Sequence, residues 1–204
     1  MTKLYTAGRA LFALLALAAL SACTVFSQTP LVSDSEVATP LDPSFALVFY
    51  TEEPDGYTKG DDDPQPFTLT PAGYEAGDKS MTVRFVPLEG NQYLLAVNMQ
   101  GGNLYGVARI FDNHVLEVHL VLDEAYQDAI KAKLASAPAD ISGAIAITDA
   151  GVEAKTRPAL DFLVQMLAAG EIGQTPMIGY IAPSATDPFP SAITKDGDGW
   201  SVTN

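Results

Sequence analysis

The chain has 204 residues, and its 25 acidic and 11 basic side chains give it a formal charge of −14 at pH 7. This acidic balance argues against nucleic-acid binding, which needs a basic surface to replace phosphate counterions, and against polybasic contact with anionic lipid head groups. The lone cysteine, Cys23, excludes an intramolecular disulfide. The length is that of one domain, large enough to bury a core without cross-links.

The first 22 residues have the three parts of an export signal. Lys3 and Arg9 are the only charged residues in this segment, and residues 10–20 are an unbroken run of apolar side chains. This run is shorter than the roughly 20 residues that a membrane-spanning helix needs. We therefore expect a signal peptide, which ends in two small residues immediately before Cys23.

The sequence Leu20-Ser21-Ala22-Cys23 resembles the lipobox of bacterial lipoproteins. The resemblance implies that residues 1–22 are removed and that Cys23 then carries three acyl chains, two through a diacylglyceryl group on sulfur and one on the amine. Each buried methylene contributes about 0.8 kcal/mol of membrane affinity and one chain holds only marginally, so three chains imply a durable anchor. The alternative is an ordinary signal peptide, with Cys23 left as a free thiol or removed.

The residue after the cysteine bears on location. Thr24 stands where many inner-membrane lipoproteins of Gram-negative bacteria carry aspartate. The resemblance therefore implies attachment to the outer membrane, facing the periplasm. The membrane is then one partner, through the acyl chains, while an envelope protein partner and the oligomeric state stay open.

Three segments are expected along the chain: the signal peptide over residues 1–22, the lipidated cysteine with a flexible tether over residues 23–43, and one globular domain over residues 44–204. The tether is expected because residues 24–43 contain three prolines, many serines and threonines, and no clear period.

The clearest structural pattern lies between residues 81 and 122. Met81, Val83 and Phe85 alternate with polar residues, and Gly, Asn and Asp turns separate this run from three further apolar runs. Such a pattern predicts four consecutive antiparallel strands in a meander. Further strands are expected over residues 44–51, 67–70, 141–148 and 177–182, with a final hairpin over residues 192–202.

Two helices are expected to pack on one side of this sheet. The first follows an Asp123 cap over residues 124–135, and the second begins near Thr156 and stops at Gly170. The fold class is therefore α+β, dominated by an antiparallel β-meander, with a curled half-barrel as one form that the sheet can take.

Metal sites are not favoured by the pattern. His114 and His119 are five residues apart on a predicted strand, so their side chains are expected on opposite faces. The run Asp61-Asp62-Asp63 is the better candidate for a hard cation, but charge runs in loops are usually solvated. The run 196–199 resembles the start of a calcium loop but fits a hairpin turn better.

Catalytic and anion-binding motifs are also weak. The chain has no Gly-x-Ser-x-Gly nucleophile elbow and no glycine-rich phosphate loop between a strand and a helix. Arg84 and Arg109 are expected on neighbouring strands and are candidates to bracket an anionic group, but pairing with nearby carboxylates is favoured. We therefore assign Cys23 as the lipidation site and expect no catalytic, cofactor-binding or metal-binding residue, and no cofactor.

We rank three hypotheses for the function of this protein, beginning with the best supported. The first is a non-catalytic binding, accessory or structural lipoprotein of the cell envelope. The second is a carrier or chaperone for lipid or another apolar ligand, although the Gly-x-Trp signature of lipocalins is missing from the first strand. An enclosed apolar cavity larger than a few hundred Å³ would favour this carrier, and a filled core with flat surfaces would exclude it. The third is a carboxylate-based hydrolase.

Overall fold

The computed structural model describes residues 24–99, 102–121, 125–173 and 176–204 of the chain. Cys23 and the expected helix cap Asp123 therefore lie outside the described residues. The described part is mainly antiparallel β-structure with three α-helices, which confirms the expected α+β class.

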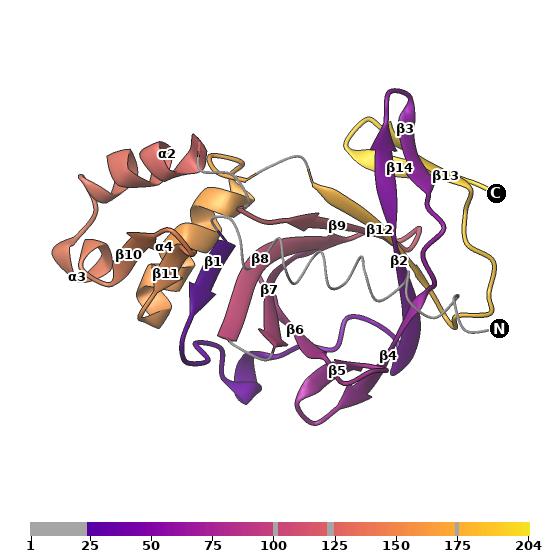
Figure 1. Ribbon diagram of the computed structural model, residues 1–204, viewed down its shortest axis with the longest axis horizontal. Coiled ribbons are helices and arrows are strands. Elements are labelled where there is room, and N and C mark those ends of the chain that lie inside the picture. The colour runs from indigo at the N-terminus through magenta and orange to yellow at the C-terminus, as the bar shows by residue number, and fades with distance from the viewer. Residues whose placement is uncertain (1–23, 100–101, 122–124, 174–175) are drawn as a thin grey trace.

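Eight strands form a closed antiparallel barrel in the centre of the molecule (Figure 1). In the order of their pairing they are β2 (Ser44–Glu53), β4 (Gln65–Thr70), β5 (Gly73–Ala76), β6 (Met81–Pro87), β7 (Gln92–Met99), β8 (Gly102–Ile110), β9 (Val115–His119) and β12 (Met177–Ala182). β12 closes the circle because it pairs with β9 along one edge and with β2 along the other. The sheet thus closes completely, beyond the half-barrel that was one of the forms the sequence left open.

The predicted meander is confirmed as strands β6 to β9, which pair in sequence order. The alternation along these strands separates two environments. Met81, Val83 and Phe85 of β6 lie with the side chains of the barrel interior, whereas Val86 packs in a second core outside the barrel wall. This is the period-two pattern of a sheet that is covered on both faces.

Two glycines allow close contact between strands of the barrel. A Cβ on Gly106 of β8 would lie 2.6 Å from the carbonyl oxygen of His119, and one on Gly179 of β12 would lie 2.9 Å from Cδ1 of Leu47. At Gly106 the neighbouring atom belongs to the backbone, so only glycine accommodates so close an approach of the next strand. β8 changes its partner at Gly106, pairing before it with β1 (Thr24–Ser27) and after it with β9.

The sheet continues beyond β8 on the side that carries the helices (Figure 1). β1 lies parallel to β11 (Gly151–Ala154), which pairs with β10 (Ile145–Thr148). The helices are α2 (Ala125–Leu134), α3 (Ala139–Ser142) and α4 (Arg157–Ala168). α4 contacts both β8 and β11, so it covers the junction between the barrel and this extension.

The sequence features that predicted α4 are confirmed. The Thr156 side chain caps the helix by accepting the N–H of Ala159, and Gly170 follows the helix with a φ of 70°. Leu160 and Leu163 are fully buried, as expected. None of the helices within the described ranges has the length and apolar character needed to cross a bilayer.

The segment expected to be a flexible tether is packed against the domain. Its strand β1 lies in the sheet, and a 3₁₀ turn, η1 (Asp34–Glu36), follows. Val25 and Val32 are buried in the core under α4, and Leu31 donates its N–H to the hydroxyl of Tyr105 at 3.0 Å. The tether expectation is wrong here because a few apolar residues pair with distant strands, which a search for local periodicity does not detect.

On the opposite side, a small sheet extends the barrel from β2. It contains β3 (Gly56–Lys59) and the hairpin of β13 (Ala192–Asp196) and β14 (Gly199–Thr203). The expected hairpin is confirmed, with Gly197 in its turn at a φ of 58°. β3 and β5 were not predicted as strands.

Candidate functional site

Aromatic side chains fill part of the barrel interior. The rings of Phe45 and Phe67 stack at 5.1 Å between centroids, and Tyr74 meets the edges of Phe45 at 5.3 Å and Phe85 at 5.8 Å. The buried Tyr74 hydroxyl donates to the carbonyl oxygen of Leu41 at 2.7 Å. Its polar atom is therefore satisfied, and this part of the barrel is an ordinary packed core.

The rest of the interior is a cavity of about 120 Å³. Its wall comes from seven of the eight barrel strands together with β1 and Leu41, and Phe49, Val97, Leu104 and Val118 are typical of it. Among the described residues that line the cavity, none is charged, and the side-chain oxygens are those of Thr24 and Tyr105. The chemistry of the wall therefore suits hydrocarbon and offers nothing to neutralise an ion.

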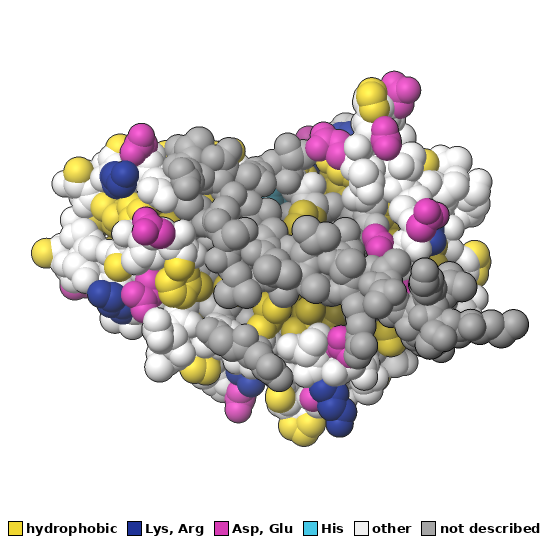
Figure 2. All heavy atoms as spheres, in the orientation of Figure 1, with side chains coloured by type: hydrophobic (Ala, Val, Ile, Leu, Met, Phe, Trp, Pro, Cys, Tyr) yellow, Lys and Arg dark blue, Asp and Glu magenta, His cyan; other side chains and the backbone are white. Residues whose placement is uncertain are grey.

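Three of the five methionines of the chain, Met81, Met99 and Met177, line this cavity. All three are half-buried, as are Val83 and Val97 beside them. A methionine side chain is unbranched and adapts its shape to what it contacts. The cavity wall can therefore adjust to a ligand more readily than a wall of Val and Ile. Figure 2 shows hydrophobic side chains in the middle of the face above the barrel.

The size of the cavity limits what can occupy it. An eight-stranded barrel is just wide enough to be filled by side chains or to hold one small ligand. At about 120 Å³ the cavity is below the few hundred Å³ that would hold a whole drug-sized molecule. It is close to the volume, about 150 Å³, at which an apolar protein cavity stays dry and binds a small ring. A small apolar molecule, or the end of a longer chain, is therefore the ligand that fits.

Thr24 places the beginning of β1 in the cavity wall. It is 2% exposed and pairs in register with Gly151 of β11. The residue that precedes it in the chain is Cys23. The predicted lipidation site is thus one residue away from a residue that lines the apolar cavity.

A polar cluster lies outside the barrel around Glu117 of β9. Its side chain is 3% exposed and bonds through Oε1 to Nε2 of His119, while Oε2 accepts the indole N–H of Trp200 at 3.0 Å. Arg109 Nη1 lies 3.4 Å from Oε1 and Lys195 Nζ lies 3.9 Å from Oε2. The cluster joins β8 and β9 to the C-terminal hairpin.

Electrostatics hold Glu117 in its charged form. Burial alone would raise its pKa, but the hydrogen bonds from His119 and Trp200, with the attraction of His119 and Lys195, outweigh burial and lower the pKa below the ordinary 4.5. A carboxylate this well supplied with donors stays deprotonated, so it holds no proton to donate as a general acid. The cluster is therefore best described as a structural ion network.

The two arginines considered as an anion site do not lie on neighbouring strands as expected, because β7 separates β6 from β8. Arg84 of β6 pairs with Ala96, while Arg109 of β8 pairs with Gln92, four residues further along β7. Arg84 instead bonds to Asp34 at 3.0 Å, and Arg109 bonds to Glu117. Each arginine thus has a carboxylate partner, as the favoured alternative expected.

Arg84 also borders a second cavity of about 180 Å³ on the outer face of β6, β7 and β8. Two side-chain amides in the wall of this second cavity are hydrogen-bonded. Asn98 donates to Asn103 at 2.9 Å, and Asn103 donates to the carbonyl oxygen of Ser27 at 3.4 Å. The amide groups of Asn98 and Asn103 are therefore already hydrogen-bonded within the protein.

The candidate metal residues lie apart. His114, with a φ of 67°, sits in the turn before β9 and packs against Tyr180, whereas His119 bonds to Glu117. Asp61, Asp62 and Asp63 lie in the loop between β3 and β4. Within the described ranges, no three His, Cys, Asp or Glu side chains converge as a metal ion would require.

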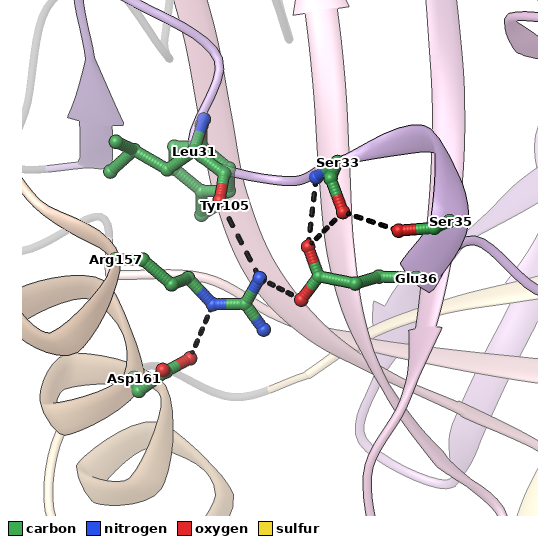
Figure 3. Close-up of polar contacts among 7 residues, drawn as sticks. All are labelled: Leu31, Ser33, Ser35, Glu36, Tyr105, Arg157 and Asp161. Atoms are coloured by element: carbon green, nitrogen blue, oxygen red, sulfur yellow. Dashed lines mark hydrogen bonds and ion pairs between the residues drawn. The ribbon is translucent and has the colours of Figure 1, made fainter.

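Arg157 of α4 holds the segment after β1 (Figure 3). Its Nε donates to Asp161 at 2.7 Å, and its Nη1 contacts both Glu36 and the carbonyl oxygen of Leu31. Glu36 in turn accepts the N–H of Ser33 at 2.8 Å. These bonds fix the path of the chain after β1 and, with it, the position of β1 in the cavity wall.

Sequence reasoning grouped Met81, Val83 and Phe85 on one face without assigning that face a cavity. It placed Glu117 beside His119 on the solvent side, whereas the structure buries this carboxylate, and it did not single out Arg157. Methionine is an ordinary gap-filling core residue, so no local signal marked the cavity before the strands were closed. Comparisons with protein-family models, with curated proteins and with solved structures found no match for this chain.

Proposed function

We propose that this protein is a lipid-anchored protein of the bacterial envelope that binds an apolar ligand inside its barrel. The observation that carries the proposal is the cavity of about 120 Å³, whose described lining residues include three methionines and no charged side chain. The binding role in the envelope and the carrier role are thereby joined in one hypothesis. The small volume restricts the carrier role to a small ligand or to part of a larger one.

The hydrolase remains the weaker alternative. A glycoside or ester hydrolase that uses carboxylates needs one of them with a raised pKa in a cleft. Glu117 is the buried carboxylate among the described residues, and its pKa is lowered by its partners. It also faces away from the apolar cavity, on the outer side of β9. These observations support a binding role over a catalytic one.

The ligand-binding part of the proposal is tested by filling the cavity. Val97→Phe adds volume where space exists, and Val202→Phe, at a 37% exposed position outside the barrel, is the matched control. 1-Octanol should stabilise the full chain and the control equally, by about 1.4 kcal/mol at ten times its Kd, and should not stabilise Val97→Phe. Equal stabilisation of all three proteins would contradict binding in the barrel.

The anchor is tested separately at Cys23. Cys23→Ser should abolish incorporation of radiolabelled palmitate and leave the precursor uncleaved at this site, because the thiol is the acylated group. The octanol response of the barrel should not change. Cleavage before residue 23 or acyl labelling that survives this substitution would show that the anchor hypothesis is wrong.

A further inference from the structure

We infer that the cavity holds the end of one acyl chain of a membrane lipid, whose head group stays outside the barrel. This inference rests on the proposed function and specifies its ligand. The occupant is a lipid of the membrane to which the protein is attached, rather than a small molecule from solution.

The apolar wall of the cavity favours the acyl chain of a lipid and excludes the lipid head group. A phosphate or carboxylate inside the cavity would meet no charged partner among the described lining residues, and an unpaired buried charge is strongly disfavoured. A hydrocarbon chain carries no charge and therefore needs no such partner. Each methylene that leaves water contributes about 0.8 kcal/mol, and the methionines can close around a chain of variable shape.

The volume agrees with partial insertion. A cavity of about 120 Å³ holds something the size of a small ring, so it receives a short terminal stretch of a chain and not a whole lipid. The remaining stretch would then lead out past the half-buried Met81, Met99 and Met177. Each of these apolar side chains lines the cavity and is itself partly exposed.

The position of β1 explains how a lipid chain can reach the cavity. Thr24 lies in the cavity wall, and Arg157 with Tyr105 fixes the chain that follows β1. Because no spacer separates Cys23 from Thr24, an anchor at Cys23 would hold the cavity close to the bilayer surface. A chain end can then move from the bilayer into the barrel without crossing a layer of water.

Photo-crosslinking tests this inference on the full chain in phosphatidylethanolamine vesicles. Two lipid probes are compared, one with a diazirine at the end of an acyl chain and one with a diazirine on the head group. The chain-end probe should label cavity residues such as Met177 and Leu104 at least about fivefold more than the head-group probe. Val97→Phe should lose these adducts, whereas Val202→Phe should keep them.

Two results would overturn the inference. Equal labelling of the cavity by both probes would show that the head group is not excluded. Absence of cavity adducts from the chain-end probe would show that the barrel does not take membrane lipid, whether it is empty, holds the acyl chain of Cys23 or binds another partner. If octanol still stabilises the protein in that case, the proposed function survives and only the lipid assignment fails.

Discussion

The indole nitrogen of Trp200 donates a hydrogen bond to Oε2 of Glu117 at a distance of 3.0 Å. This contact joins the C-terminal hairpin to β9 of the barrel, and Lys195 reinforces it by lying 4.5 Å from the centre of the Trp200 ring. The buried carboxylate is thus the common partner of Arg109, His119, Lys195 and Trp200, which come from β8, β9, β13 and β14.

Glu117→Gln should destabilise the protein by about 3 kcal/mol, because it leaves the cations around a buried position without their charged partner. The measurement is urea unfolding of the full chain followed by circular dichroism. Glu89→Gln, in an exposed turn, is the control and should change the free energy of unfolding by less than about 0.5 kcal/mol. If Glu117→Gln also changed the free energy of unfolding by less than about 0.5 kcal/mol, the ion network around Glu117 would not be stabilising the fold.

The same carboxylate predicts how stability depends on pH. The pKa of Glu117 is lowered in the folded protein relative to 4.5, so the stability it contributes is present above pH 4.5 and is lost as pH falls through the lowered value. Glu36, whose pKa is lowered chiefly by its hydrogen bonds with Ser33, acts in the same direction. The free energy of unfolding should therefore fall below pH 4.5, less steeply in Glu117→Gln. Identical slopes in the two proteins would refute the assignment to Glu117.

Arg157→Gln should loosen the segment after β1 without unfolding the barrel. Removing the bonds to Glu36 and Leu31 should speed hydrogen exchange at the amides of Leu31 and Ser33 about fivefold, which corresponds to about 1 kcal/mol. Lys155→Gln, on an exposed neighbouring residue, is the control. Unchanged exchange at both amides would mean that Arg157 does not hold this segment.

Gly106→Ala should destabilise the barrel by about 1–3 kcal/mol, because the added Cβ would lie 2.6 Å from the carbonyl oxygen of His119. Gly60→Ala is the matched control, since the nearest atoms would be 3.7 Å away. Thermal unfolding of both variants provides the comparison. Equal midpoints would show that β8 and β9 can separate at this point at little cost.

Local patterns in the sequence predicted the elements but not their closure. The alternation at Met81, Val83 and Phe85 and the cap at Thr156 depend on neighbours a few residues away, so they were detectable. The pairing of β12 with both β9 and β2 joins segments far apart in the chain, and the same holds for β1. A cavity is defined by what strands fail to fill once they are closed, so no local pattern could have revealed it.

The most direct test of ligand binding in the barrel is methyl NMR of the full chain labelled with ¹³C at the methionine methyl groups. Met81, Met99 and Met177 line the cavity, whereas Met166 is buried in the core under α4 and reports changes elsewhere. Titration with 1-octanol should shift the three cavity signals and leave that of Met166 in place, and Val97→Phe should abolish the shifts. If Met166 moves as much as the other three, or if none of the signals moves, the barrel does not bind an apolar ligand.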